Sequence, residues 1–160
     1  MKELTIEPVN QHNFSVFLDL IRKLAEYEKL EPPDQAAETR LKRDALSKPP
    51  KFHAYLGFLY GEVVGYVIFC MTYSSFLAKP VLYLEDIFVL EKWRRQGMGA
   101  QLFNFCLEQA SKLGCGKMEW CVLDWNRSAM NFYEKHGARR LPWVFYRLTE
   151  EQISQRLARK

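Results

Sequence analysis

The stretch that decides the fold runs from residue 83 to residue 100: Tyr83-Leu84-Glu85-Asp86-Ile87-Phe88-Val89, then Leu90-Glu91-Lys92-Trp93, then Arg94-Arg95-Gln96-Gly97-Met98-Gly99-Ala100. This stretch predicts a strand, then a basic loop, and then a helix whose start is marked by Gly97 and Gly99. The first turn of a helix has unpaired N–H groups and a positive dipole end, and glycine lets a ligand approach the backbone. Such a junction suits an anion such as a pyrophosphate. A tight turn without any ligand would need the same glycines, so the motif alone leaves both interpretations open.

The sequence on either side predicts strands and helices in mixed order. Gly61 lies in a predicted hairpin turn, and Asn13 is a candidate helix cap. Strict alternation of strands and helices is absent, which predicts an α/β (α+β) protein with a mixed sheet. The expected strands cover residues 3–9, 52–59, 63–73, 81–90, 117–123 and 143–148, and the expected helices cover residues 14–24, 35–46, 97–113 and 126–136, with a short last helix after Thr149.

Composition places the chain among ordinary globular proteins and predicts one domain over residues 1–160. Its 160 residues are 48% hydrophobic and 26% charged, with a net charge of +4. No apolar run approaches the roughly 20 residues that cross a bilayer, and no signal segment begins the sequence, so we expect a cytoplasmic protein with no membrane partner. The charge is too small to indicate a nucleic-acid partner. The spacing of four cysteines and three histidines predicts reduced thiols in or near the core and no metal site.

Two spaced motifs resemble the hallmarks of the GNAT superfamily of N-acetyltransferases. The first is Arg94-x-x-Gly97-x-Gly99-Ala100, and the second is Asn126-Arg127-Ser128-Ala129-Met130-Asn131-Phe132-Tyr133-Glu134-Lys135-His136-Gly137-Ala138. Within the superfamily, the chain is most similar to the spermidine/spermine (diamine) N-acetyltransferases, over about residues 6–157. The resemblance implies the GNAT fold, a single mixed and mostly antiparallel sheet flanked by helices on both faces. It also implies a homodimer.

The resemblance implies acetyl-CoA as the cofactor. In the family, the main chain of one strand pairs with the pantetheine amides, and the glycine loop wraps the pyrophosphate. An Asn at a helix start is equally expected to be only its cap, so both interpretations stay open for Asn126. The residues implied for cofactor binding are Ile87, Phe88, Val89, Arg94, Arg95, Gln96, Gly97, Met98, Gly99, Ala100, Asn126, Arg127, Ser128, Ala129 and Tyr133.

Direct transfer of an acetyl group to an amine requires two proton movements. An alkylammonium, whose pKa is about 10.4, must first lose a proton. Glu85 is the candidate base, acting through a water. The departing sulfur needs a proton, and the resemblance gives this role to Tyr133. From residue type alone, Tyr133 would be a core aromatic beside Phe132, and Glu85 would be a carboxylate paired with a surface arginine.

A cationic acceptor is expected to meet carboxylates. Taken without the resemblance, Glu28 could be a solvated helix end, and Trp120 and Cys121 could belong to the strand core. The resemblance places the amine pocket at Tyr27, Glu28, Glu85, Asp86, Glu119, Trp120 and Cys121.

The chain departs from the polyamine enzymes at residues 137–143. Those enzymes carry an acidic loop there, whereas this loop is short and contains Arg139 and Arg140. Two positive charges in place of a carboxylate disfavour a long polycation and favour an acceptor with its own carboxylate, such as a lysine-like amino acid. The arginines could instead bind cofactor phosphates or face solvent.

The predicted function is therefore acetyl-CoA-dependent N-acetylation of a primary amine on a small molecule, either a diamine or polyamine or a lysine-like amino acid. Two alternatives stay open: a peptide or protein amine as acceptor, and a non-catalytic acyl-CoA-binding module. A nucleic-acid-binding domain built on Arg94, Arg95, Arg139 and Arg140 is not favoured.

Overall fold

The computed structural model describes residues 2–159. The chain forms two compact units that divide between Cys121 and Val122. The sheet and its covering helices belong to the first unit, and two further helices belong to the second. The expectation of one domain over residues 1–160 stays a prediction.

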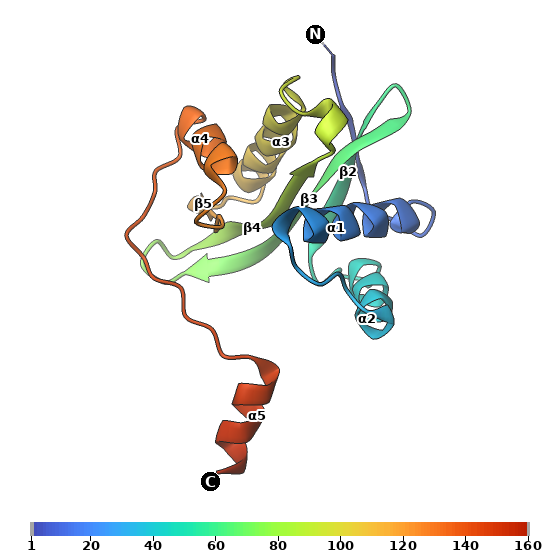
Figure 1. Ribbon diagram of the computed structural model, residues 1–160. Coiled ribbons are helices and arrows are strands. Elements are labelled where there is room, and N and C mark those ends of the chain that lie inside the picture. Colours follow the sequence, from blue (N-terminus) through green and yellow to red (C-terminus); the bar gives the residue numbers. More distant parts are fainter. Residues whose placement is uncertain (1, 160) are drawn as a thin grey trace. The chain divides into compact units, whose positions relative to one another are not determined.

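The first unit is built on one five-stranded sheet with the strand order β1-β2-β3-β4-β5. The first four strands pair antiparallel, and β4 pairs with β5 in parallel. The predicted mixed, mostly antiparallel sheet is confirmed, and Figure 1 shows its strands with the helices along them. The strands are β1 (Thr5–Pro8), β2 (His53–Leu59), β3 (Glu62–Ser74), β4 (Lys79–Val89) and β5 (Lys117–Glu119).

Helices cover both faces of this sheet, as predicted. On one face, α1 (Phe14–Glu28) buries Phe17 in a core cluster that also contains Leu56 of β2. The next strand residue, Gly57, faces the other way, because a Cβ built on it would lie 3.0 Å from Leu102 of α3 (Met98–Lys112). Neighbouring strand residues point to opposite faces, so these contacts place α1 and α3 on opposite sides. The first unit also contains α2 (Gln35–Ala45) and a 3-10 turn, η1 (Glu91–Trp93).

Close approach between β3 and β4 depends on Gly65. Gly65 lies opposite Val89, and a Cβ built at Gly65 would lie 2.1 Å from the carbonyl oxygen of Phe88. No side chain fits at that distance, so only glycine permits this pairing. The hairpin that precedes it turns at Tyr60 and Gly61, both with positive φ (52° and 81°), which confirms the predicted turn.

A β-bulge interrupts the β3–β4 pairing at Glu85. Ile68 lies opposite Asp86 and Phe69 lies opposite Leu84, so Glu85 is an extra residue on β4 without a partner in the register. A bulge breaks the strict alternation of side chains and re-aims the residues beside it. The sequence prediction treated this strand as regular and did not include the bulge.

Two predicted features of the first unit need correction. Asn13 precedes α1 as expected, but its side chain makes no cap to the helix and instead accepts a hydrogen bond from the Asn10 backbone N–H at 2.7 Å. The strand expected over residues 117–123 ends at Glu119, since the register with β4 stops at the Tyr83–Glu119 pair. Beyond that pair, the chain has no described neighbouring strand with which to form a ladder.

The second unit contains α4 (Arg127–Lys135) and α5 (Glu150–Ala158). The short helix predicted after Thr149 is confirmed as α5, and Thr149 and Gln152 form a full capping box at its start. The strand expected over residues 143–148 is wrong, because this segment has no strand hydrogen bonding. A strand exists only through a neighbour, and the second unit has no other described strand. Trp143 and Tyr146 are 79% and 89% exposed.

All four cysteines are free, and they differ in burial. Cys106 is buried, Cys70 and Cys115 are partly buried, and Cys121 is exposed, so the prediction of thiols in or near the core is wrong for Cys121. Burial raises the pKa of the Cys106 thiol to about 12. Over the described residues, no helix is both long and apolar enough to span a bilayer.

Candidate functional site

The start of α3 offers unpaired backbone donors. Gly97 occupies the N-cap in the left-handed region (φ 83°), and no side chain caps the helix there. The first backbone N–H of the helix that donates to a preceding carbonyl is that of Gln101, which bonds to the Gly97 carbonyl oxygen at 3.2 Å. A Cβ built on Gly97 would meet no atom within 4 Å, so the space beside this turn is open. Exposed Arg95 and the helix dipole add positive charge, which fits a pyrophosphate.

One edge of β4 is free beside that turn. On one side β4 pairs with β3 up to Val89, but on the other side β5 pairs only with Val81, Leu82 and Tyr83. No described strand pairs with the second edge at residues 84–89. Backbone amides there can bind an extended ligand as an added strand. This edge and the α3 turn together fit the pantetheine and pyrophosphate parts of acetyl-CoA, and the edge includes the predicted residues Ile87, Phe88 and Val89.

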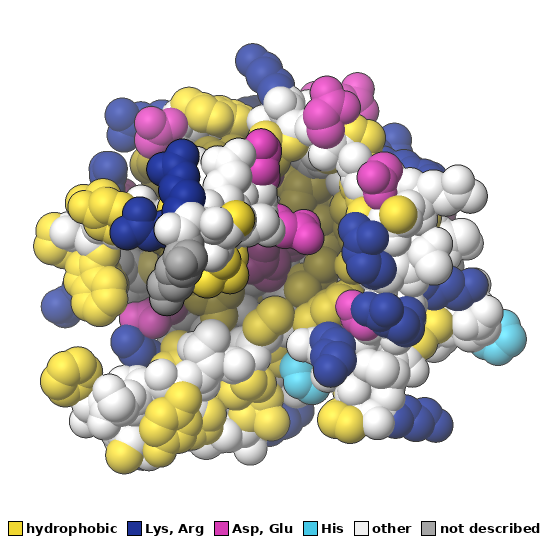
Figure 2. Space-filling view, turned by 90° about the horizontal axis from the view of Figure 1, so that it is seen from below, with side chains coloured by type: hydrophobic (Ala, Val, Ile, Leu, Met, Phe, Trp, Pro, Cys, Tyr) yellow, Lys and Arg dark blue, Asp and Glu magenta, His cyan; other side chains and the backbone are white. Residues whose placement is uncertain are grey.

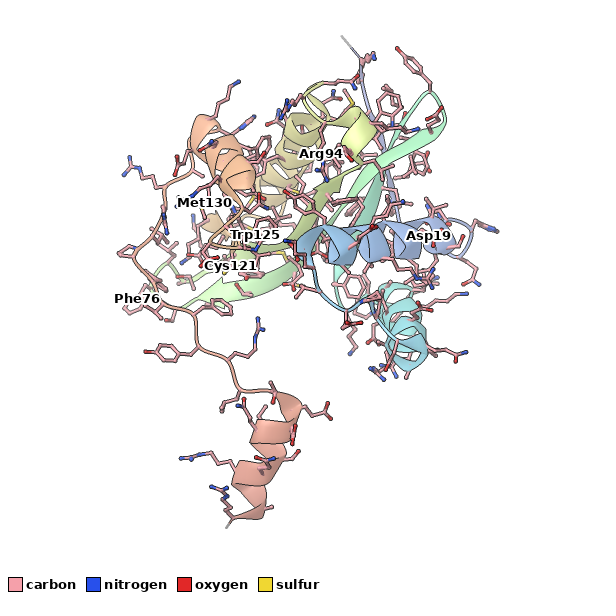
Figure 3. All side chains as sticks on the ribbon, in the orientation of Figure 1. Asp19, Phe76, Arg94, Cys121, Trp125 and Met130 are labelled. Atoms are coloured by element: carbon pink, nitrogen blue, oxygen red, sulfur yellow. The ribbon has the colours of Figure 1, made fainter. Side chains whose placement is uncertain are left out.

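Arg94 braces the loop between β4 and α3. Its Nε donates to the Val89 carbonyl at 2.8 Å, and its guanidinium lies over the rings of Tyr27 (4.7 Å) and Phe88 (5.5 Å). Figure 3 labels Arg94 at this connection. Arg94 was predicted to bind cofactor and Tyr27 to line the amine pocket, yet the structure joins them in one stack. A direct cofactor contact from Arg94 stays a prediction.

The bulge brings carboxylates together. Asp86 is partly buried, and burial followed by the charge of Glu85 raises its pKa to about 6. Glu28, at the end of α1, adds a smaller repulsion to Asp86, and burial raises the pKa of Glu28 itself. Among the described residues, no lysine or arginine forms an ion pair with any of these three. Glu28, Glu85 and Asp86, here named the acidic trio, are all residues that the sequence had predicted.

Tyr66 joins the acidic trio from β3, and sequence reasoning missed it. Its hydroxyl donates to Asp86 Oδ2 at 3.2 Å, while the residue is 0% exposed. Burial first, and the Asp86 charge second, raise the pKa of Tyr66 well above its ordinary value. A tyrosine in a strand predicted to be buried needs a partner for its hydroxyl, and that was the available signal.

The other predicted acceptor residues of the first unit lie around β5. Glu119 forms an ion pair with Lys117 at 2.6 Å, so its charge is already balanced. Trp120 packs edge-on against Phe103 of α3, with ring centroids 5.5 Å apart. Cys121 Sγ accepts a hydrogen bond from the Tyr83 hydroxyl at 3.5 Å, and Figure 3 labels it just beyond β5.

The remaining predicted residues lie in the second unit. The Asn126 side chain accepts from the Ala129 N–H at 3.1 Å, so the cap interpretation is confirmed for Asn126. Tyr133 is the buried residue of α4 and contacts Phe132 edge-on, with ring centroids 5.3 Å apart. The cofactor and acid roles of these residues, and of Arg127 and Ser128, stay predictions.

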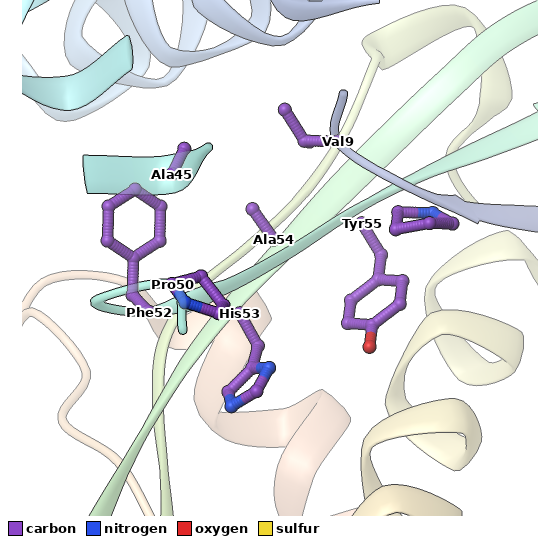
Figure 4. Close-up of a pocket in the computed structure, with 8 residues that line it drawn as sticks. Val9, Ala45, Pro50, Phe52, His53, Ala54 and Tyr55 are labelled. Carbon is purple, nitrogen blue, oxygen red and sulfur yellow. The ribbon is translucent and has the colours of Figure 1, made fainter. Parts of the chain in front are cut away.

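The surface of the first unit is also hollowed away from the acidic trio. An open depression of about 580 Å³ lies beside α1 and the loop after β4, lined by Lys23, Leu90, Glu91 and Lys92. A smaller pocket of about 130 Å³, shown in Figure 4, contains none of the predicted site residues. In that pocket His53 and Tyr55 point away from Ala54, as strand alternation requires.

Comparison with known proteins gives one family and several relatives. The model of the acetyltransferase (GNAT) family matches residues 17–138. A mouse thialysine N-epsilon-acetyltransferase is 32% identical over 97% of this chain and 98% of its own length. An L-ornithine N5-acetyltransferase from Arabidopsis thaliana is 48% identical over 57% of this chain, and the match spans 40% of that relative.

A solved structure extends the likeness in fold. An aminoglycoside N-acetyltransferase, AAC(6')-Iy, in complex with CoA superposes with a TM-score of 0.75 at 18% identity, over 94% of this chain and 97% of that one.

Replacing Arg94 with lysine is expected to weaken CoA binding about tenfold, because lysine keeps the charge but loses the planar stack and the fixed Nε donor. Titration of the purified variant with CoA measures the change. Arg43→Lys is the matched control, since Arg43 forms an exposed pair with Asp44 on α2. Equal CoA affinity in the two variants would contradict the role of Arg94 in holding the loop between β4 and α3.

Proposed function

The chain belongs to the acetyltransferase (GNAT) family and is an acetyl-CoA-dependent amine N-acetyltransferase, and we propose that its acceptor is a small molecule with a primary amine, of the lysine or ornithine kind. The observation that carries the proposal is the acidic trio. Three carboxylates lie close together on α1 and β4, with no ion pair among the described residues. Like charges at close range are unfavourable, and a bound ammonium relieves that repulsion.

The position of the trio supports an acceptor role. Glu85 lies in the bulge, and the free edge that fits pantetheine continues from there to Val89. A reacting amine bound at the trio would therefore be close to the acetyl end of a cofactor on that edge. Glu119 contributes less, because Lys117 already neutralises it.

Two further observations favour an amino acid over a long polyamine. The relatives reported above are named for thialysine and ornithine, which are amino acids with a side-chain amine. Arg139 and Arg140 are exposed, and their two positive charges disfavour a long polycation as the acceptor. A diamine or polyamine is the second candidate, because the acidic trio would also attract a further ammonium.

The proposed chemistry assigns one proton movement to each catalytic residue. Bound acetyl-CoA supplies the acetyl group as a thioester. Glu85 accepts the amine proton through a water, so that the nitrogen can form the new C–N bond as the C–S bond breaks. Tyr133 donates its proton to the departing sulfur. The acetylated nitrogen then loses its surplus proton, which returns to Tyr133 through water, while Glu85 releases the first proton to solvent.

We also propose a homodimer. The segment 141–148 leaves Leu141, Trp143, Val144, Phe145 and Tyr146 more than half exposed. An apolar patch of this kind marks an interaction surface more often than a free one. Light scattering at micromolar concentration measures the mass, and a monomer would contradict the dimer.

The alternatives have less support. A non-catalytic binding module has no need of three close carboxylates that form no ion pair with any described residue. A nucleic-acid partner would need a basic stripe, and on the face seen in Figure 2 the lysines and arginines are scattered. A peptide amine as acceptor differs from a free amino acid only in what flanks the reacting nitrogen, and the experiment below includes it.

Thiol release from acetyl-CoA against a panel of amines tests the proposed acceptor. The panel contains lysine, ornithine, thialysine, a short diamine, spermidine, spermine and a lysine peptide. We expect the free amino acids to have the highest kcat/KM. A ranking led by spermine would favour the polyamine candidate, one led by the peptide would favour a protein acceptor, and no turnover with intact CoA binding would favour the binding module.

The proton-transfer roles predict separate losses. Tyr133→Phe should lower kcat roughly a hundredfold, and Glu85→Gln should lower it by a similar factor that shrinks as the pH approaches the amine pKa. Steady-state rates at saturating acetyl-CoA measure both effects. Tyr73→Phe is the control for loss of a hydroxyl, because Tyr73 is 67% exposed on β3. Wild-type turnover in Tyr133→Phe would remove the acid role.

A further inference from the structure

We propose that Tyr66 is a positioning residue that fixes the Asp86 carboxylate in its charged form and orientation for the acceptor ammonium, and so sets the preference for cationic amines. This inference rests on the proposed function. The observation behind it is separate from those that support the function: the Tyr66 hydroxyl donates a hydrogen bond of 3.2 Å to Asp86 Oδ2.

The hydroxyl of Tyr66 has no packing reason to be there. The ring is fully buried, contacts Phe17 edge-on at 5.5 Å and lies 6.1 Å from the ring of Phe88. A phenylalanine would fill the same space without burying a polar atom, and a buried hydroxyl is unfavourable unless it is bonded. The hydroxyl donates its hydrogen bond to Asp86. The hydroxyl is therefore best explained by what it does to that carboxylate.

The charge on Asp86 needs such support. Among the described residues, the titratable groups that interact with this carboxylate are Glu28 from α1, Tyr66 and Cys70 from β3, and Glu85 beside it on β4; none of them is a cation. Burial first, then Glu85 and to a lesser extent Glu28, raise the pKa of Asp86, whereas the Tyr66 hydrogen bond lowers it. Tyr66 thus opposes the surroundings that would otherwise protonate Asp86 near neutral pH.

The bulge makes the orientation matter as well. Glu85 and Asp86 are consecutive residues, and of the two only Asp86 has a partner in the β3–β4 register. Either carboxylate could therefore turn toward a bound amine. A bond from the rigid, fully buried Tyr66 restricts Asp86 to one geometry. This leaves exposed Glu85, the proposed base, free to bind the water through which it accepts a proton.

The first arm of the test needs no substrate. Carbon-13 NMR of the aspartate side-chain carboxyls is followed against pH in the full-length protein, with the Asp86 signal assigned from Asp86→Asn. The wild-type midpoint should lie at about 6. It should move to higher pH in Tyr66→Phe and stay in place in Tyr55→Phe, which removes a hydroxyl on the opposite face of the sheet. An unmoved midpoint in Tyr66→Phe would overturn the inference.

The second arm measures acceptor kinetics. At pH 6.5, Tyr66→Phe should raise the KM for the amine roughly tenfold, with kcat and the KM for acetyl-CoA little changed, since a hydrogen bond to a charged group is lost. The ratio of variant to wild-type kcat/KM cancels the ionisation of the amine itself, and it should recover toward pH 8.5. In an Asp86→Asn background, Tyr66→Phe should have no further effect.

The outcomes separate this inference from the proposed function. An active wild type whose KM for the amine is unchanged in Tyr66→Phe would overturn the positioning role and leave the function in place. A wild type that binds CoA but acetylates no amine would overturn the function, and with it the amine-directed role of Tyr66. A fall in kcat equal at all pH values would indicate mere structural damage and would also overturn the inference.

Discussion

The pairing of β3 with β4 is the constraint on which the rest of the structure depends. It requires glycine at position 65, because any Cβ there would collide with the Phe88 carbonyl oxygen. It also carries the bulge at Glu85. Together these features determine which edge of β4 is left for a ligand, where two consecutive carboxylates lie, and how the strand leads into the Gly97 turn. One local pairing thus positions both the β4 edge proposed for the cofactor and the acidic trio.

The acidic trio is a case in which function opposes stability. Burial and mutual repulsion disfavour the charged form of Asp86, and over the described residues no cation is paired with the trio. A protein selected for stability alone would neutralise such a group. The Tyr66 hydrogen bond and the Arg94 brace keep this arrangement ordered, since one fixes Asp86 and the other holds the neighbouring loop against α1.

The sequence predicted the elements well wherever a local signal existed. Periodicity and turn residues located α1, the Tyr60-Gly61 hairpin and the last helix after Thr149. The bulge at Glu85 and the Tyr66–Asp86 bond depend on which residues lie opposite one another, and a linear pattern contains no such information. The strand expected at residues 143–148 failed for the same reason, because β-propensity cannot supply a neighbouring strand. The motifs located the candidate site, but only the structure distinguished Glu119, which forms an ion pair, from the acidic trio, which forms none with the described residues.

The central claim is that Asp86 remains charged at a cost to the fold, and the pH dependence of stability tests it most directly. The folded pKa of Asp86, about 6, is above its ordinary 3.8, so the native state holds this proton more tightly and loses stability as the pH rises between these values. The free energy of unfolding of wild type and Asp86→Asn, measured in urea across that range and up to pH 7.5, isolates the effect. The account predicts that Asp86→Asn gains stability relative to wild type as the pH rises through 6. A wild type that instead gains stability over the variant would mean that a cation of the protein already pairs with Asp86, and would contradict the account.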